Sequence, residues 1–346
     1  MTPPPTTPTT TPAASVPAGA ARPVTLSASA RRMLSGQTLW IFVIFIGLIV
    51  AFTAINGTAF ASVANARNIL ASVAILLVLS LGQMLVILTA GIDLSSGGVL
   101  VFSGVIAVMT LNAVGGSAGI TVGVLAALAA GALWGVINGL MVAYARIPPI
   151  IATLGSFGMS MGLALVITGG IDLRGPLELV QSLGIGDIGG AVPFLAIVAF
   201  GVAAVVAVLL SQTRFGRHTY AVGASMTAAE RCGIKVKHHL VWVYALAGVL
   251  TGLAGFLALS RFGTTTISGH AEDSLKAITA VVLGGTSLFG GSGTVRGTVV
   301  GAFIPVILLN GFVITGVQVF WQQFAIGLVL VVAVFIDQLR HSRDPS

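Results

Sequence analysis

Long apolar runs limit what this chain can fold into. Ten of them recur along 346 residues, most close to the length of helix that crosses a ~30 Å hydrocarbon core. Hydrophobic residues make up 56% of the chain and charged residues only 7%, whereas soluble domains carry about 25% charged residues. A soluble fold could not cover so much apolar surface. The sequence therefore predicts an all-α polytopic membrane protein with about ten transmembrane helices, at residues 39–56, 69–90, 97–113, 119–145, 149–168, 192–210, 240–260, 275–289, 298–317 and 319–336.

The run at 275–289 is shorter than the others. A length of about 15 residues is too short for an unbroken span. It predicts either a broken helix or a segment that enters the membrane incompletely.

The distribution of basic residues supports an even number of spans. With ten spans and a cytoplasmic N-terminus, only four of the 16 Lys and Arg residues lie outside, as the positive-inside rule requires. We therefore expect both termini in the cytoplasm. Topology then accounts for the net charge of +7, and nucleic acid need not be a partner. The four outer residues are Arg67, Arg174, Arg261 and Lys276.

Three regions follow from this pattern. Residues 1–37 begin with a Pro-, Thr- and Ala-rich stretch and are expected to be a disordered cytoplasmic tail. Residues 38–337 form the transmembrane domain, and 338–346 form a cytoplasmic C-terminal tail.

Small residues recur at four-residue spacing in three of the apolar runs. Such stripes let helices approach closely in lipid. Packing within the chain is the simpler interpretation, and a seam between two copies is the alternative. The stripes are Gly123, Ala127, Gly131, Gly135 and Gly139; Gly248 and Gly252; and Gly297 and Gly301.

A polar stretch, LTAGIDLSSGGVL at 88–100, interrupts the apolar pattern. A charge at the bilayer centre costs about 2.5–3.5 kcal/mol on insertion scales and is usually functional. Irregular backbone at this depth is tolerated only where it is buried in protein or lines a water-filled cavity. Asp93 or Ser95 could instead accept hydrogen bonds from the first N–H groups of the next helix. Both interpretations, a helix cap and a pathway element, stay open.

A second Gly-rich stretch, VLGGTSLFGGSGTVRG at 282–297, is no phosphate loop, because none of the three lysines has the required position. The sequence has no metal-ligand set and no nucleophile motif, so we expect no catalytic site, metal or cofactor. The five histidines fall outside the expected spans, where solvated side chains are the default. The hairpins 88–113 and 277–317 share a helix–break–helix layout, and a diverged internal repeat is an open alternative.

The longest expected cytoplasmic loop is 211–242. Within it, residues 226–232 predict a short helix with Ser225 or Thr227 as its cap and Gly233 at its end. Its small face could dock into a groove of another protein. A basic turn that meets anionic membrane lipid is the alternative.

Five segments in order resemble the permease subunits of bacterial ABC importers of the ribose type, over roughly 38–337. They are LTAGIDLSSGGVL, WGVINGLMVAYARIPPIIATLGSFGMSMGLAL, TRFGRHTYAVGASMTAAERCGIKV, GLAGFLALSRFG and AITAVVLGGTSLFGGSGTVRGTVVGAFI. The resemblance implies a permease that forms a dimer, expected to be a homodimer. It also implies a cytoplasmic ABC ATPase subunit that hydrolyses ATP and a periplasmic sugar-binding protein that delivers the substrate.

The same resemblance implies site residues. The ATPase-coupling loop, 211–239, would act through Arg217, Gly223, Ala228, Ala229, Gly233 and Ile234, with Thr227 where related importers carry Glu. The translocation path would involve Asp93, Leu94, Ser95, Asn138, Thr153, Leu154 and Gly155. A path with so little charge suits a monosaccharide or sugar alcohol.

Two other classes compete with the permease interpretation. An ion-coupled secondary transporter of a small polar solute would need a buried ionisable group, for which Asp93 is the candidate. A membrane scaffold or receptor that transports nothing would need no ATPase partner.

Overall fold

The computed structural model describes residues 36–270 and 272–341. Almost all of the expected N-terminal tail, and residues 342–346 of the C-terminal one, lie outside these ranges. The long helices are α2 (Gly36–Asn56), α3 (Val63–Leu88), α4 (Ser96–Val114), α5 (Gly116–Ala143), α6 (Pro149–Thr168), α8 (Phe194–Gln212), α11 (Val236–Phe262), α13 (Val295–Thr315) and α14 (Val319–His341). The shorter elements are η1 (Gly57–Ala59), α7 (Leu177–Leu179), η2 (Val180–Gly184), β1 (Asp187–Ile188), β2 (Val192–Pro193), α9 (Arg214–Ala224), α10 (Met226–Arg231), η3 (Ile267–His270) and α12 (Asp273–Leu283).

The helix lengths confirm an all-α polytopic membrane protein. Within the described ranges, eight helices are long and apolar enough to cross a membrane. α14 contributes a shorter apolar stretch, Val319–Phe335. α12 has only 11 residues and ends at Leu283, well before the expected end of its span, so this segment is a short helix followed by a break, and the depth to which it enters the membrane stays a prediction. The total of ten spans stays a prediction.

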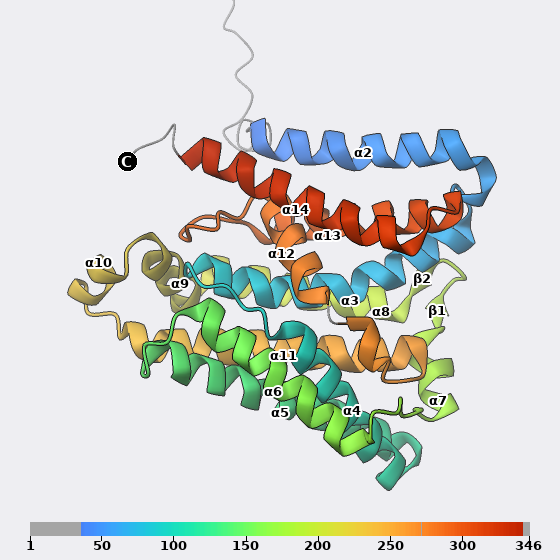
Figure 1. Cartoon of the computed structure of the whole chain (residues 1–346), viewed down its shortest axis with the longest axis horizontal. Helices are drawn as coiled ribbons and strands as arrows, with labels where there is room; N and C mark the ends of the chain where they lie inside the picture. Colours follow the sequence, from blue (N-terminus) through green and yellow to red (C-terminus); the bar gives the residue numbers. More distant parts are fainter. Residues whose placement is uncertain (1–35, 271, 342–346) are drawn as a thin grey trace, which may run out of the picture.

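α3 lies at the centre of the bundle. Every residue from 73 to 89 is buried, and its side chains share one core with α8, α11, α12 and α13. In Figure 1, α2 and α14 form the layer at one side of the bundle, and α5 and α6 form the layer at the other. α3 is hydrophobic all round because protein, rather than lipid, surrounds it.

The glycine stripes pack helices within the chain. A Cβ on Gly131 would fall under 3.0 Å from the carbonyl oxygen of Gly248, so α5 and α11 meet at backbone distance. A Cβ on Gly301 would similarly overlap the carbonyl oxygen of Ala280 on α12. Each of these stripes is covered by another helix of the same chain. The alternative, that the stripes form a seam between two copies, is therefore wrong.

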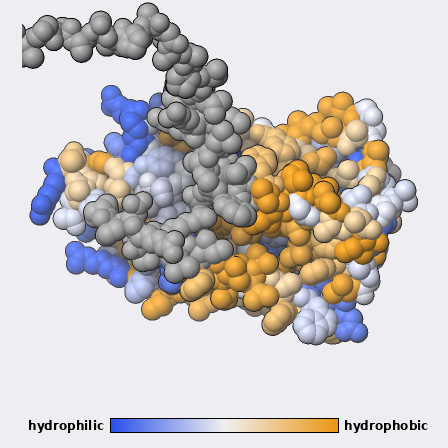
Figure 2. Space-filling view, turned by 90° about the horizontal axis from the view of Figure 1, so that it is seen from above, coloured by the Kyte–Doolittle hydropathy of each residue, from blue (hydrophilic) through white to orange (hydrophobic). Residues whose placement is uncertain are grey.

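The two ends of the bundle carry different elements. α9 and α10 project from one end, whereas α7 and the β1–β2 hairpin lie at the other (Figure 1). Figure 2 shows hydrophilic residues gathered around the α9–α10 end and hydrophobic residues over the middle of that face. At the hairpin end, Arg67 at the start of α3 forms an ion pair with Asp187. This pattern is the one expected for a protein that crosses a bilayer along the helix direction.

Two expectations about the loops and tails need correction. His239 and His270 are buried, so the histidines are not all solvated loop side chains. His239 belongs to the first turns of α11, which begins four residues earlier than the expected span. α14 continues to His341, so residues 338–341 of the expected C-terminal tail are helical.

Candidate functional site

The candidate site is the break between α3 and α4, residues 89–95. α3 ends where the N–H of Gly91 bonds to the carbonyl of Val86 at 3.1 Å, with Ala90 at φ 59°. The end of α12 has the same geometry: the N–H of Thr286 bonds to the carbonyl of Val281 at 3.2 Å, with Gly285 at φ 85°. Both breaks thus begin with the same helix end, and a repeat beyond this feature stays a prediction.

Asp93 folds the break. Its side chain is buried, and one carboxylate oxygen accepts from the N–H of Ser95 at 2.8 Å and from the Ser95 hydroxyl at 2.5 Å. Its backbone is held by the Gln83 amide, which donates to the Asp93 carbonyl at 2.9 Å and accepts from the Asp93 N–H at 3.2 Å. Asp93 therefore acts as the acceptor of a tight turn. The ion pairs of the described residues do not include it.

α5 and α6 hold the break from one side. The Asn138 amide donates to the Ser95 hydroxyl oxygen at 2.8 Å and accepts from the Ser156 hydroxyl. Thr153 accepts from the N–H of Leu94 at 3.0 Å and donates to the carbonyl of Pro149 at 2.8 Å. Asn138, Thr153 and Ser156 are all buried. Four of the predicted path residues thus belong to one buried cluster with Ser156: Asp93, Ser95 and Asn138 are linked through side chains, and Thr153 is attached through the N–H of Leu94.

α12 caps α4 from the other side. The Ser274 hydroxyl oxygen accepts from the N–H of Gly97 at 2.8 Å and donates to the carbonyl of Leu94 at 3.0 Å. It also accepts from the hydroxyl of Ser96, 178 residues away in the sequence, at 2.9 Å. Ser95 makes no side-chain cap bond to the helix, so the expectation that it caps α4 is wrong. Asp93 caps only the preceding turn.

The remaining three predicted path residues contribute no side chain to the cluster. Leu94 is half-buried beside the cluster. Leu154 is 56% exposed, and a Cβ on Gly155 would meet nothing within 4 Å. These two residues lie on the outer face of α6, together with Gly158 and Gly162, which are equally open. The Gly-x-x-x-Gly spacing of this face is a signal in the sequence that the predicted stripes did not include.

The expected coupling loop contains two helices. α10 spans Met226–Arg231, and the Ser225 hydroxyl accepts from the N–H of Ala228 at 3.2 Å, which confirms the predicted short helix and its cap. Gly233 follows at φ 83°, a left-handed conformation that favours glycine. α9 was not predicted. It is capped by Thr213, which accepts from the N–H of Gly216 at 3.3 Å.

The predicted coupling residues divide between surface and support. Arg217, Ala228 and Gly233 are exposed, and Ile234 is half-buried. Ala229 is buried in a small apolar cluster with residues of α5, α9 and α11. The small residues therefore do not form one continuous exposed face, because Ala229 anchors α10 to the bundle.

Gly223 brings α9 against both breaks. A Cβ there would overlap the carbonyl oxygen of Leu88, at the end of α3, and the N–H of Gly291. Gly291 lies in the second break, residues 284–294 between α12 and α13. The Leu88 carbonyl and the Gly291 N–H bond to each other at 3.0 Å. Nearby, the Tyr220 hydroxyl donates to the carbonyl of Gly293 at 3.0 Å, and burial raises the pKa of this phenol. One helix of the loop thus contacts both Gly-rich segments. We call the contact of Gly223, Leu88 and Gly291 the three-way junction.

Comparison with known proteins agrees with this architecture. A family model described as "branched-chain amino acid transport system / permease component" matches residues 65–334. The ribose import permease of Bacillus subtilis (strain 168) is 38% identical, over 85% of this chain and 91% of that protein. The fructose import permease of Rhizobium meliloti is 34% identical, over 84% and 82% respectively. The autoinducer 2 import system permease of Enterobacter sp. (strain 638) is 35% identical, over 89% and 88%.

No solved structure matches the chain. The matched family covers most of the bundle, from the first turn of α3 to α14. The apolar helices and these relatives identify a multi-pass protein of the inner membrane. The chain belongs to the family of ABC importer permeases that includes the ribose import permeases.

Proposed function

We propose that this chain is the permease subunit of an ABC importer that moves a monosaccharide or a sugar alcohol across the inner membrane. The family description names branched-chain amino acids, but relatives are named for ribose and fructose import. A neutral solute is favoured because Leu154 and Gly155, which would line the path, carry no charge, and the carboxylate of Asp93 at the first break is bonded to Ser95. An amino acid would bring two charges that call for charged partners.

The three-way junction carries this proposal. A motor protein that pushed or pulled α9 would act directly on Leu88 and Gly291, because Gly223 of α9 packs against both residues without a gap. Leu88 is five residues from Asp93 in the chain, so the motion would reach the hydrogen-bonded cluster. An ion-coupled transporter has no need for such a link between a projecting loop and its path.

The proposed partners follow from the two ends of the bundle. The ATPase, a separate chain that hydrolyses ATP, would bind α9 and α10 through Arg217, Ala228, Gly233 and Ile234, with Gly223 and Ala229 as support. The sugar-binding protein would dock at the end with α7 and the β1–β2 hairpin. Ten spans with both termini on the α9–α10 side would place these surfaces in the cytoplasm and periplasm respectively.

The second permease chain would bind along the outer face of α6. Small residues on an exposed membrane face permit close helix approach, and Gly155, Gly158 and Gly162 are open there. Leu154 and Gly155 would then line the path between two copies, with the cluster of Asp93, Ser95, Asn138 and Thr153 supporting α6 from behind and Leu94 beside it.

A pull-down from the native host tests the ATPase contact. We expect an ATPase to co-purify with the tagged wild type in mild detergent and to be lost with Gly233→Arg. Gly190→Arg is the matched control. Gly190 is also exposed, has φ 73° against 83° for Gly233, and a Cβ added to either would meet nothing within 4 Å, but Gly190 lies at the opposite end. Equal recovery of the ATPase with both variants would contradict the proposed coupling surface.

Uptake measurements separate the two transporter classes. Uptake of radiolabelled sugar should survive collapse of the proton and sodium gradients and stop on ATP depletion. The reverse pattern would favour the ion-coupled alternative and Asp93 as its ionisable group.

A further inference from the structure

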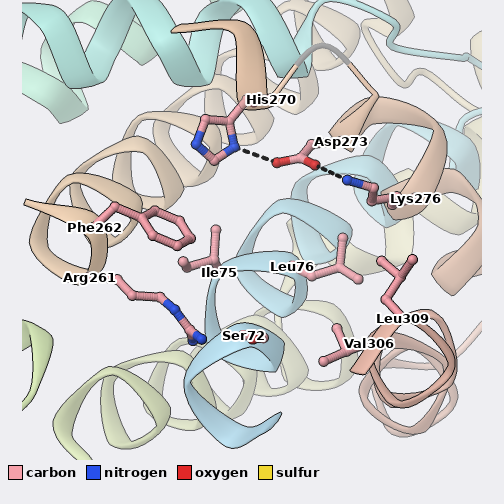
Figure 3. Close-up of a pocket in the computed structure, with 11 residues that line it drawn as sticks. Ser72, Ile75, Leu76, Arg261, Phe262, His270, Asp273, Lys276, Val306 and Leu309 are labelled. Carbon is pink, nitrogen blue, oxygen red and sulfur yellow. Dashed lines mark hydrogen bonds and ion pairs between the residues drawn. The ribbon is translucent and has the colours of Figure 1, made fainter. Parts of the chain in front are cut away.

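A cavity of about 260 Å³ lies beyond the candidate site, between α3, α11, α12 and α13. Apolar side chains from α3 and α13 form much of its wall: Ile75, Leu76, Val306 and Leu309. Four ionisable side chains also line it, namely Arg261, His270, Asp273 and Lys276. Figure 3 shows His270, Asp273 and Lys276 linked along one edge, with Arg261 at another. None of these residues takes part in the three-way junction or the cluster at the first break.

The single carboxylate among these lining residues, Asp273, is held by two of the others. One Asp273 oxygen contacts Nδ1 of His270 at 2.6 Å, and the other accepts from Lys276 at 2.9 Å. Nε2 of His270 lies 2.8 Å from the Thr266 hydroxyl. Lys276 retains two further N–H donors, since its ammonium carries three. Asp273 and Lys276 cancel in charge, and the cavity keeps the positive charge of Arg261.

Arg261 has an unused donor. Its Nη2 donates to the side-chain oxygen of Asn68 at 2.7 Å and to the Asn68 carbonyl at 3.3 Å. Its Nη1 is buried and has no hydrogen-bond partner among the described residues, and no ion pair there includes the guanidinium. A buried, unpaired donor on a cation is costly. The cavity is therefore lined by an unmatched positive charge on Arg261 and by spare N–H donors on Lys276.

This imbalance selects the chemistry of the ligand. A neutral sugar would leave the positive charge of Arg261 unmatched, since no ion pair of the described residues includes its guanidinium. A phosphodiester brings only acceptors and one negative charge, which matches Arg261. The apolar wall suits the chain region of an amphiphile. We propose that this cavity binds the headgroup of an anionic phospholipid, with the phosphodiester on Arg261 and further headgroup oxygens toward Lys276. In the orientation proposed above, the lipid would belong to the outer leaflet.

The test uses the full-length protein purified in a neutral detergent. Phosphatidylglycerol in mixed micelles should raise the thermal unfolding midpoint by about 5 °C, because a ligand that binds only the folded state stabilises it. Phosphatidylcholine, inorganic phosphate and ribose should each give no such rise. The phosphatidylglycerol effect should be lost in Arg261→Gln and kept in Arg174→Gln, an arginine outside the cavity.

Each other outcome overturns the proposal in a distinct way. Equal stabilisation by phosphatidylcholine would indicate a general lipid effect, and stabilisation by phosphate alone would indicate a soluble anion site. A rise with ribose that Arg261→Gln removes would make the cavity a sugar site. If Arg261→Gln fails to fold, native mass spectrometry of the wild type decides: retained phosphatidylglycerol should exceed phosphatidylcholine from an equimolar mixture, and equal retention would overturn the proposal. None of these measurements depends on the ATPase or on uptake.

Discussion

At the scale of single residues, two roles of Asp93 can be distinguished. It is either a hydrogen-bond acceptor that holds the turn or an ionisable group that couples transport to an ion. Asp93→Asn keeps a side-chain oxygen for the N–H and hydroxyl of Ser95, so we expect sugar uptake within about twofold of wild type. Asp93→Leu removes the acceptor inside a buried turn, and uptake should fall by at least about tenfold. Initial rates of radiolabelled sugar uptake at equal expression measure both. Abolished uptake in Asp93→Asn would point instead to a required negative charge and to ion coupling.

Asn138 is the second residue whose replacement should be informative. Asn138→Leu would leave the Ser156 hydroxyl without its buried acceptor, at a cost of about 1–3 kcal/mol. It would also remove the donor to Ser95, whose hydroxyl keeps its bond to Asp93. The thermal unfolding midpoint should therefore fall by several degrees. Leu133→Ala, at an exposed position of the same helix, α5, is the control and should change the midpoint little. Similar midpoints for the two variants would mean that the cluster contributes nothing to stability.

The sequence could predict part of this cluster. Asp93 and Ser95 stood out because polar residues are rare between apolar runs, and Thr153 followed a Pro-Pro helix start. Ser156 and Ser274 gave no such signal, since single serines in apolar helices are common. Ser274 acts on Gly97 across 177 positions of sequence, and only the packing of α12 against α4 creates that cap.

At the scale of elements, Gly223 should control how α9 packs. Gly223→Ala would force its methyl group into the Leu88 carbonyl and the Gly291 N–H, and overpacking of this kind costs about 1–3 kcal/mol. We expect a lower unfolding midpoint and, in vesicles with the ATPase, weaker stimulation of ATP hydrolysis by the loaded binding protein. Gly201→Ala, in α8 with nothing within 4 Å, is the matched control. Unchanged stimulation in a folded Gly223→Ala would separate α9 from coupling.

The start of α12 predicts a dependence of stability on pH. Burial alone would raise the pKa of Asp273, but the hydrogen bond from His270 and the charge of Lys276 outweigh it and hold the pKa below its usual value. The stabilisation is therefore complete above about pH 4, the unfolded value, and is lost as the pH falls through the lower folded pKa.

Thermal midpoints against pH check this. The deficit of Asp273→Asn relative to wild type should be present near about pH 6 and should shrink below about pH 4. Glu272→Gln alters the neighbouring acid, which takes part in no ion pair of the described residues, and should show no such trend. A deficit that stays constant down to low pH would assign the effect to packing.

The helices differed in how well they could be predicted from the sequence. The apolar spans were predicted to within about six residues at their ends, because membrane length and hydrophobicity both constrain them. α9 was missed, since RFGRHTYAVGA is too polar to read as a span and too short to show a repeated period. α12 was predicted as a short apolar segment, but its end at Leu283 is fixed by the turn at Gly285.

At the scale of the whole molecule, the bundle separates the end proposed to bind the ATPase, with α9 and α10, from the end proposed to bind the sugar-binding protein, with α7 and the β1–β2 hairpin. The three-way junction lies at the end that carries α9, and the cavity with Arg261 lies at the far end of α11, which begins beside α10. The glycine seams between α5 and α11 and between α12 and α13 pack these helices at backbone distance, with no space between them for a shift. Motion at α9 would therefore be carried mainly by the two breaks, where the helices are interrupted.

The proposed homodimer gives the last prediction, a cross-link along α6. The chain has a single cysteine, Cys232, so Cys232→Ser provides a clean background. Leu154→Cys in that background should form a disulfide-linked dimer in native membranes under mild oxidation, because the glycines on the same face allow two helices to approach closely. Val205→Cys is the control: its side chain is 68% exposed on α8, and a lipid-facing thiol should stay monomeric. Equal amounts of dimer from both positions would indicate random collision. Absence of dimer from Leu154→Cys would contradict both the proposed α6 seam and the proposed path between two copies.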